Sequence, residues 1–443
     1  MSWSSPGLWF LGLVAAWLVA GAVLRHRSPI AYWYLIGYPA TWVRITSSWR
    51  PLCVERGLST ARRSGQTMVG DMIVRGQDVR PIIPRLWIGR PMRDGLSVRV
   101  RLLPGQTPEQ YSSATEALMH TWRMATVRVS SPERGYVVIV ARRRDPLEGV
   151  VVRDDGIAPV LPSDAPPGRP ILTLDVGVTE RATSWRINLR SLPHWLIVGQ
   201  TRSGKSTLIH AMVSRLAGMA VALVAIDLKG GMEMRTYGPR LSGLATTRTE
   251  ANELLGRLLA LMQDRMAECT KHNKRNVWDL PVPPPPVVVL IDEVAELYLI
   301  SEPGEKALRD QSTATLLRLA QLGASLDIHL VVGAQRFGSD LGPGATALRA
   351  QLGGRVCMAV GDPESAVMTL GDKWPDAVAT AQMITAQHRG FAVAADDEGS
   401  WMRVRCMLTT PEDAMATAQA TAWLRPVLPG ISFPYDMPEG GEE

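Results

Sequence analysis

The apolar positions at the start of the chain form an unbroken run. No charged side chain occurs before Arg25, and about 18 apolar residues over 7–24 approach the shortest length that spans a bilayer as a helix. We expect a transmembrane helix there. A secretory signal is the weaker interpretation, because no basic residues precede the run, and Arg25, His26 and Arg27 follow it in place of a small-residue cleavage site.

A second uncharged run, Pro29–Val43, is shorter and rich in Tyr and Trp, which favour the headgroup level of a membrane. It either spans the bilayer or lies in the interface. If it spans, both ends of a helical hairpin are cytoplasmic; if it does not, the basic residues after Leu24 favour an outside N-terminus. Both alternatives place the large body in the cytoplasm. We predict a membrane anchor over 1–50, with one or two transmembrane helices.

Strand-like and helix-like patterns then predict a small α+β domain over 51–165. Two strands lie between residues 85 and 103, joined at the hairpin signal Asp94-Gly95. A helix begins at Thr107-Pro108, since Thr is a fair N-cap and Pro suits the first helical position. Two more strands follow, which gives the order β-β-α-β-β.

Beyond a Pro-rich stretch at 162–170, buried strand runs alternate with amphipathic helices. This pattern is typical of a mostly parallel sheet covered by helices on both faces. We therefore predict an α/β domain over 166–410, followed by a C-terminal helix and an acidic tail over 411–443.

Composition adds a charge asymmetry. The 443 residues are 46% hydrophobic and carry a net charge of +6, but residues 25–144 hold 20 Arg, no Lys and 7 acidic residues. That window has a net charge of +13, and the rest of the chain has −7. Such an Arg-rich collar suits an anionic membrane surface or a nucleic acid, or it is an ordinary solvated face. The 4 Cys are far apart, which predicts neither a zinc site nor a disulfide framework.

The sequence contains a phosphate-binding motif directly after an apolar strand. The apolar strand 196–198 leads directly into G-x-x-x-x-G-K-[ST] and then into a helical segment, the context that this motif requires. Backbone N–H groups would wrap the β-phosphate, Lys205 would reach the β- and γ-phosphates, and the Ser206 hydroxyl would bind Mg²⁺. The predicted ATP-binding residues are Gly199, Gln200, Thr201, Arg202, Ser203, Gly204, Lys205, Ser206 and Thr207.

Two further strands end in polar residues. The apolar strand Val287–Ile291 ends in Asp292-Glu293, where Asp292 would hold Mg²⁺ through water and Glu293 would orient and deprotonate the attacking water. Gln335 follows the strand at 329–333 and would sense the γ-phosphate. We predict Lys205, Glu293 and Gln335 as catalytic residues, Ser206 and Asp292 as Mg²⁺ ligands, and a P-loop NTPase fold of the RecA-like kind.

Four segments, in order, resemble the FtsK/SpoIIIE DNA translocases: GQTRSGKST, VALVAIDLKGGMEM, VVVLIDEVAEL and IHLVVGAQR. The motors of that family carry a D-x-K-G-G segment between the phosphate loop and the acidic strand, and a strand that ends T-Q-R. The resemblance covers about residues 171–407. The matching positions are Asp227, Lys229, Gly230 and Gly231 for the first feature, and Gln335 and Arg336 for the second.

Within that family, the short anchor, the LLPGQTPEQ segment and TALRAQLGGRVCMAVGDPESAVMTLGD resemble the conjugative Tra proteins of actinobacterial plasmids and integrative elements. The chain departs from the septal pumps where it lacks the arginine of G-R-A-x-G-I-H. The arginine that acts across a subunit interface is therefore open, with Arg318, Arg336 and Arg355 as candidates. The roughly thirty residues after the motor leave no room for the winged-helix module with which the septal pumps read sequence.

The resemblance implies an ATPase that uses ATP and Mg²⁺ to move double-stranded DNA as a membrane-anchored homo-oligomer, expected to be a hexamer. The DNA would be moved for conjugative transfer or for chromosome segregation at the septum. Any recognition of a transfer locus would come from an accessory protein or from the small domain. Arg235 and the segment Arg336–Asp340 are candidate DNA contacts. The alternatives are an FtsK-like motor of a protein secretion system and a membrane scaffold that binds ATP without hydrolysing it. Glu293 argues against the scaffold.

Overall fold

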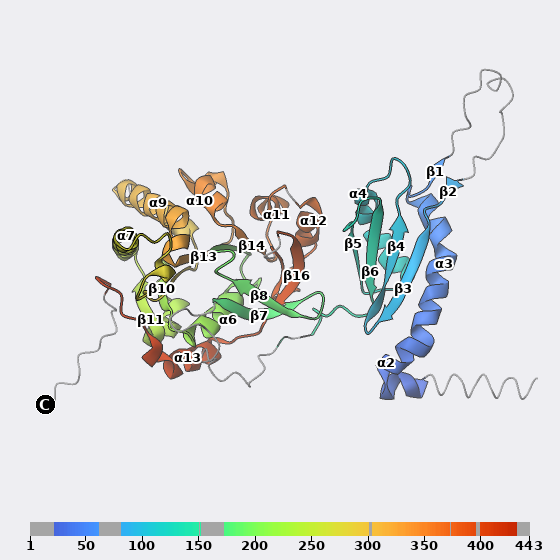
Figure 1. The fold of residues 1–443 in the computed structure, drawn as a ribbon, viewed down its shortest axis with the longest axis horizontal. Coiled ribbons are helices and arrows are strands. Elements are labelled where there is room, and N and C mark those ends of the chain that lie inside the picture. Colours follow the sequence, from blue (N-terminus) through green and yellow to red (C-terminus); the bar gives the residue numbers. More distant parts are fainter. Residues whose placement is uncertain are drawn as a thin grey trace, which may run out of the picture. The chain divides into compact units, whose positions relative to one another are not determined.

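The computed structural model describes residues 22–61, 81–149, 151, 172–300, 304–372, 374–395 and 399–431. The chain divides into two compact units, 1–148 and 149–443 (Figure 1). The predicted helix over 7–24, apart from its last residues, the Pro-rich stretch at 162–170 and the acidic tail lie outside the described residues.

The first unit pairs a long helical segment with an antiparallel sheet. Three consecutive elements form the segment: α2 (Pro29–Tyr32), the π-helical turn η1 (Trp33–Gly37) and α3 (Tyr38–Glu55). The sheet has the order β3-β4-β6-β5, and β1 (Thr60–Ala61) and β2 (Pro81–Ile82) form a separate pair. Its strands are β3 (Leu86–Met92), β4 (Gly95–Arg101), β5 (Thr126–Ser130) and β6 (Tyr136–Arg142).

The predicted β-β-α-β-β order is present, with one difference. The β3–β4 hairpin turns at the predicted Asp94-Gly95, where a Cβ on Gly95 would meet the Ala141 carbonyl oxygen at 2.1 Å. The single predicted helix is instead broken at Ala114 into α4 (Pro108–Ser113) and α5 (Thr115–Trp122). Ala114 leaves helical geometry at ψ 1°. Its carbonyl oxygen then accepts a hydrogen bond from the backbone N–H of Leu118, in the first turn of α5.

Residues at the end of the predicted anchor belong to the core of the first unit. Ile45 and Trp49 of α3 are buried, and the Trp49 and Trp122 rings lie 6.3 Å apart. The Trp49 indole donates to the Pro84 carbonyl at 2.8 Å. The boundary predicted at residue 50 therefore falls inside α3, because the aromatic residues expected at a membrane interface include some that pack on the sheet.

Among the residues that the structure describes, no helix is both long and apolar enough to cross a membrane.

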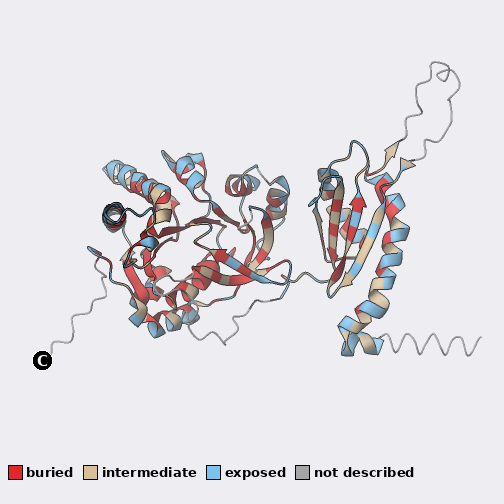
Figure 2. Ribbon diagram, in the orientation of Figure 1, coloured by how far each residue is buried: buried red, intermediate tan, exposed pale blue. Residues whose placement is uncertain are grey.

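The second unit contains a ten-stranded sheet of order β11-β10-β12-β13-β9-β14-β15-β16-β7-β8. The six strands from β11 to β14 are parallel: β9 (His194–Val198), β10 (Ala222–Ile226), β11 (Leu241–Ala245), β12 (Val287–Ile291), β13 (Ile328–Ala334) and β14 (Gly354–Cys357). Apart from single residues in β11 and β14, their residues are buried (Figure 2), as expected for parallel strands covered on both faces.

The remaining four strands are antiparallel: β7 (Thr173–Thr179), β8 (Ser184–Asn188), β15 (Phe391–Ala395) and β16 (Trp401–Cys406). The sheet is thus mixed, with a larger antiparallel part than predicted. In β7 and β8 buried residues mostly alternate with partly exposed ones, because this end of the sheet is covered on one face only.

Helices flank the parallel strands. They are α6 (Lys205–Ala217), α7 (Arg248–Lys271), α8 (Ala295–Tyr298), α9 (Glu305–Leu322), α10 (Ala345–Gln351), α11 (Pro363–Leu370), α12 (Pro375–Gln382) and α13 (Pro411–Ala420). The α13 helix, predicted as C-terminal to the motor, packs against α6 and the 3₁₀ turn η2 (Met234–Arg240). Apolar clusters on the two sides of the sheet hold these layers together.

Candidate active site

Strand order brings the sequence motifs to one edge of the sheet. The neighbours β10, β12, β13 and β9 are parallel, so their carboxyl ends meet at that edge. The residues directly beyond these ends are Asp227, Asp292, Gln335 and Gly199. The strand β13 lies between the phosphate-loop strand and the acidic strand, and this places the Gln335 backbone next to both.

The phosphate loop is held by its neighbours. Gly199 donates its backbone N–H to Ala334 O at 3.0 Å, and Gln200 donates to Ala359 O at 2.8 Å. Gly204, at φ 107°, caps α6 in a conformation that favours glycine, and a Cβ there would meet the Gly390 nitrogen at 2.8 Å. The loop is therefore shaped to present its amides at the start of α6, as a phosphate site requires.

Lys205 connects the phosphate loop to the acidic strand. Its ammonium donates to Asp292 O at 2.9 Å and to the Glu293 carboxylate at 3.2 Å. The ammonium has three donors in all. These two contacts hold the Lys205 ammonium beside Glu293, the residue predicted to activate water.

The Glu293 carboxylate is oriented from three directions. Oε2 accepts from Lys205, and Oε1 accepts from the backbone N–H of Gln335 at 3.3 Å and of Ala295 at 3.5 Å. The side chain is 6% exposed. Gly333 permits this arrangement, because a Cβ there would lie 2.2 Å from Asp292 O. A fixed, shielded carboxylate beside a phosphate loop suits a general base.

The D-x-K-G-G segment is a structural loop with one cation that faces the site. Asp227 is fully buried and accepts from the backbone N–H groups of Lys229, Glu233 and Met234 at 2.9–3.1 Å. Gly230 and Gly231 both have positive φ, of 74° and 76°. Lys229 lies 3.5 Å from the Asp292 carboxylate. Asp227 therefore shapes the loop, and Lys229 delivers charge to the site.

Glu233 is a site residue that the motifs did not single out. Its carboxyl group lies close to the Ser206 hydroxyl and 3.7 Å from His210 Nε2. Burial, together with the nearby charges of Asp292 and Asp227, raises the pKa of Glu233. The other ring nitrogen of His210 contacts the Tyr237 hydroxyl. The GGMEM segment carries an acid two residues beyond the glycines, but only the fold shows that this acid turns back to α6.

The oxygen atoms at the site are ligands that fit Mg²⁺, which prefers hard oxygen ligands and keeps several of its waters. The Ser206 hydroxyl and the Asp292 and Glu233 carboxylates supply such oxygens. Ser206 and Asp292 stay predicted Mg²⁺ ligands. Glu233 would act on the metal indirectly, through the Ser206 hydroxyl.

The three candidate trans arginines differ in their surroundings. Arg355 of β14 is half-buried and donates to Arg349 O, and burial lowers its pKa to about 10. Arg336 lies 3.5–3.8 Å from Asp340, Asp362 and Glu364. Arg318 of α9 is exposed and forms no ion pair with any described residue. Arg318 is therefore the exposed candidate that no described carboxylate holds.

Comparisons with known families agree with this geometry. The domain described as "Actinomycete conjugal transfer protein N-terminal domain" matches residues 19–142, and the FtsK/SpoIIIE family matches residues 165–281. The transfer protein TraSA of Streptomyces ambofaciens is 36% identical over 363 residues, which are 79% of this chain and 85% of TraSA. The chain belongs to the FtsK/SpoIIIE family. Within it, the chain is similar to the actinobacterial Tra proteins, as the resemblance predicted.

Other relatives of this FtsK/SpoIIIE protein give the same picture. A sporulation regulatory protein of Streptomyces azureus is 43% identical and covers 60% of this chain and 90% of its own length. The DNA translocase FtsK of Streptococcus agalactiae is 26% identical over 45% of this chain, and the match spans 26% of that longer protein.

The fold is also found in a solved structure, the pCW3 conjugation coupling protein TcpA in its monomer form with ATPγS. The TM-score is 0.52 at 17% identity, over 75% of this chain and 93% of TcpA. Family membership and the arrangement of the phosphate loop identify the protein as a nucleotide-binding ATPase. The individual catalytic roles of Lys205, Glu293 and Gln335 stay predictions.

Proposed function

We propose that this ATPase is a membrane-anchored motor that moves double-stranded DNA during conjugative transfer. The observation that carries the proposal is the Glu293 carboxylate, which donors from the phosphate loop, β13 and α8 orient beside the P-loop. A carboxylate fixed in this way suits repeated hydrolysis, and the Tra-like sequence extends through both units. A scaffold that only bound ATP would have no use for a positioned base.

Hydrolysis would divide the work among the described residues. The P-loop amides and Lys205 would hold the β- and γ-phosphates, and Glu293 would take a proton from the attacking water. The Gln335 backbone already donates to Glu293, so its side chain can extend toward the γ-phosphate. Bound Mg²⁺ would neutralise the developing charge, with Ser206 and Asp292 as its protein ligands.

We propose that the protein assembles into a six-membered ring, in which a neighbouring subunit would supply a stabilising cation. Ring motors complete each ATP site with a cation from a neighbouring subunit. The cations of the chain's own site, Lys205 and Lys229, are already held by Glu293 and Asp292. An exposed arginine such as Arg318 would therefore serve a partner's site.

The duplex would be held through its phosphates, which carry no sequence information. Arg235 is exposed beyond the D-x-K-G-G segment and is the better candidate contact. Arg336 is surrounded by three carboxylates, which would compete with DNA phosphates for it. Selection of a transfer locus would require an accessory protein or the first unit.

The test is the ATPase rate of the detergent-solubilised full chain with and without a long duplex. We expect duplex DNA to increase kcat severalfold, and rising salt to remove the increase as counterion release loses its advantage. Heparin at equal charge controls for nonspecific polyanion effects. An ATPase rate that duplex DNA leaves unchanged, but that a secreted protein substrate increases, would contradict the proposal and favour the protein secretion motor.

A further inference from the structure

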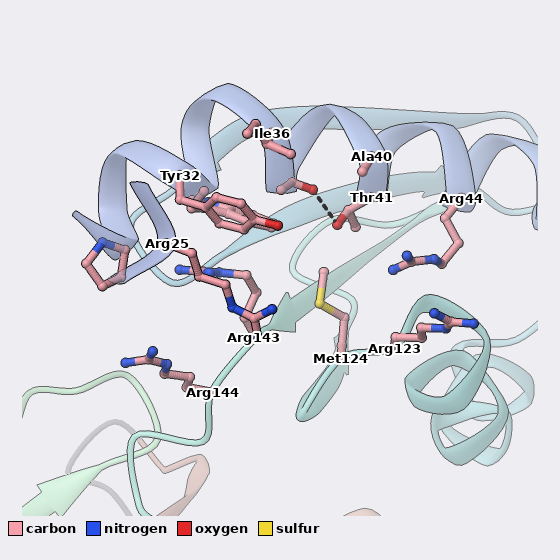
Figure 3. Close-up of a pocket in the computed structure, with 13 residues that line it drawn as sticks. Arg25, Tyr32, Ile36, Ala40, Thr41, Arg44, Arg123, Met124, Arg143 and Arg144 are labelled. Atoms are coloured by element: carbon pink, nitrogen blue, oxygen red, sulfur yellow. Dashed lines mark hydrogen bonds between the residues drawn. The ribbon is translucent and has the colours of Figure 1, made fainter. Parts of the chain in front are cut away.

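The first unit contains a cavity of about 390 Å³ lined by five arginines and no acidic residue. Figure 3 shows the labelled arginines around the space beneath the helical segment, together with Tyr32, Ile36 and Met124. They come from four places in the chain, the helical residues 22–27, α3, the end of α5 and the segment after β6. The five are Arg25, Arg44, Arg123, Arg143 and Arg144.

Two of these arginines form the inner wall. The Arg143 guanidinium lies 4.4 Å from the centre of the Trp33 ring, and the Trp33 indole donates to Met92 O at 2.8 Å. Arg44 donates to Trp122 O at 3.2 Å. Contacts to a ring and a carbonyl orient both guanidinium groups without neutralising their charge.

Within the described part of the chain, none of the five arginines forms a salt bridge with a carboxylate. Asp94, the acid whose charge acts on Arg143, already pairs with Arg142. The Nε of Arg143 is buried without a hydrogen-bond partner. Burial and the adjacent charge of Arg144 both lower the pKa of Arg143. The cluster thus concentrates positive charge that a bound anion would neutralise.

The same helical segment carries apolar surface outside the cavity. Exposed fractions are 68% for Leu35, 59% for Val43 and 46% for Trp42. Ile36 and Met124 add apolar area to the cavity wall. Apolar and aromatic side chains beside an arginine cluster are typical of a surface that lies in the headgroup region of a bilayer.

This combination favours a phospholipid over a nucleic acid. A duplex presents its phosphates on a broad convex surface, whereas this cavity is the size of a small-molecule site and is walled by apolar groups. Fork-shaped guanidinium groups match phosphate oxygens in two-bond contacts.

We propose that the cavity binds the phosphate-bearing headgroup of an anionic phospholipid, with Arg143 and Arg44 in the wall and Arg25, Arg123 and Arg144 at the rim. The proposal rests on the membrane location given under the proposed function, and it is independent of DNA movement. The first unit would thereby read the lipid composition of the membrane that it contacts.

The test is binding of dihexanoyl phosphatidylglycerol to the detergent-solubilised full chain, measured by calorimetry beside dihexanoyl phosphatidylcholine. We expect saturable binding of the anionic lipid at least about tenfold tighter than of the zwitterionic lipid. The double change Arg123→Gln with Arg144→Gln should weaken it by about tenfold or more. Both side chains are exposed, so the fold should survive. Arg25→Gln with Arg144→Gln is a second, equally exposed pair.

The matched control is Arg101→Gln with Arg134→Gln, two exposed arginines of the same unit that do not line the cavity. It should change affinity less than about twofold, because neither side chain lines the cavity. Equal binding of both lipids, or unchanged binding in both rim pairs, would overturn the proposal. So would glycerol 3-phosphate binding as tightly as the lipid, or a 20-base-pair duplex displacing it, since these outcomes assign the site to free phosphate or to DNA. Both rim double variants should keep the DNA-stimulated ATPase rate of the unaltered chain. If DNA does not stimulate the unaltered chain, the proposed function fails, but the lipid-binding measurement still stands.

Discussion

The ATP site and the arginine cavity treat charge in opposite ways. In the ATP site, Lys205 pairs with Glu293, Lys229 lies next to Asp292, and Asp227 is satisfied by backbone N–H groups. In the cavity of the first unit, five arginines face one another without a carboxylate partner among the described residues. The first site therefore carries its own counter-charges, which bound phosphates would replace. The second site is complete only with an anion from outside.

Loss of an exposed arginine on the motor is expected to have a large effect on turnover. Arg318→Ala should leave nucleotide affinity unchanged and lower DNA-stimulated kcat by about 10³-fold or more, as loss of a trans cation does. Arg355→Ala, whose arginine is half-buried and bonded within its own chain, is the matched comparison. Steady-state kinetics with nucleotide binding on the same samples separates the two. Normal turnover in all three of the Arg318, Arg336 and Arg355 variants would show that the trans cation lies elsewhere.

The next predictions concern the pair Lys205–Glu293 of the ATP site. Lys205→Ala should lose nucleotide binding, because it removes the cation on the phosphates. Glu293→Gln should bind ATP and lose about 10²–10⁴-fold in kcat, because an amide cannot accept the proton from water. Fluorescent-nucleotide binding and phosphate release measure the two effects. Lys306→Ala, an exposed lysine on α9, is the control. Ordinary hydrolysis by Glu293→Gln would remove the residue from its predicted role.

A substitution at Glu233 tests whether the carboxylate next to the Ser206 hydroxyl affects Mg²⁺ binding. Glu233→Gln keeps the size of the side chain but removes its charge, and we expect kcat to fall by about 10–100-fold, with a higher Mg²⁺ requirement. A Mg²⁺ titration of the ATPase rate measures both. Glu253→Gln, on the exposed face of α7, provides the matched change. If kcat and the Mg²⁺ dependence both match the unaltered chain, the contact with Ser206 has no part in metal binding.

Alanine substitutions at two glycines compare the crowded ATP site with an open helix surface. Gly333→Ala would push a methyl group to within 2.2 Å of Asp292 O, so ATPase activity should fall together with stability. Gly256→Ala in α7 meets no atom within 4 Å and should stabilise the motor by roughly 0.5–1 kcal/mol. Thermal unfolding with activity distinguishes them. A fully active Gly333→Ala would mean that the acidic strand tolerates movement.

The sequence predicted which motifs would meet at one edge of the sheet, because these motifs are contiguous and lie where strands end. Parallel strands then bring Gly199, Asp292 and Gln335 to one edge whatever the intervening length. Glu233 was missed, since its contact with Ser206 depends on two positive-φ glycines that turn the loop back toward α6.

The arginine cavity was not predicted as a site, although the Arg-rich collar was. Its residues span positions 25 to 144 without a motif, and only packing of α3 on the sheet brings them together. The hydrophobic pattern likewise did not separate Trp33, which is buried against the sheet, from Trp42, which is exposed. The antiparallel end of the large sheet was missed because the alternation in β7 and β8 is short.

The central claim is that ATP hydrolysis moves the protein along a duplex, and displacement of a triplex-forming strand tests it directly. The full chain, ATP and Mg²⁺ are mixed with a linear duplex that carries a labelled third strand far from the loading end. We predict that the strand is released with ATP, that release is delayed in proportion to duplex length, and that Glu293→Gln releases none. Release that is independent of duplex length, or no release while ATP is hydrolysed at its DNA-stimulated rate, would contradict the account.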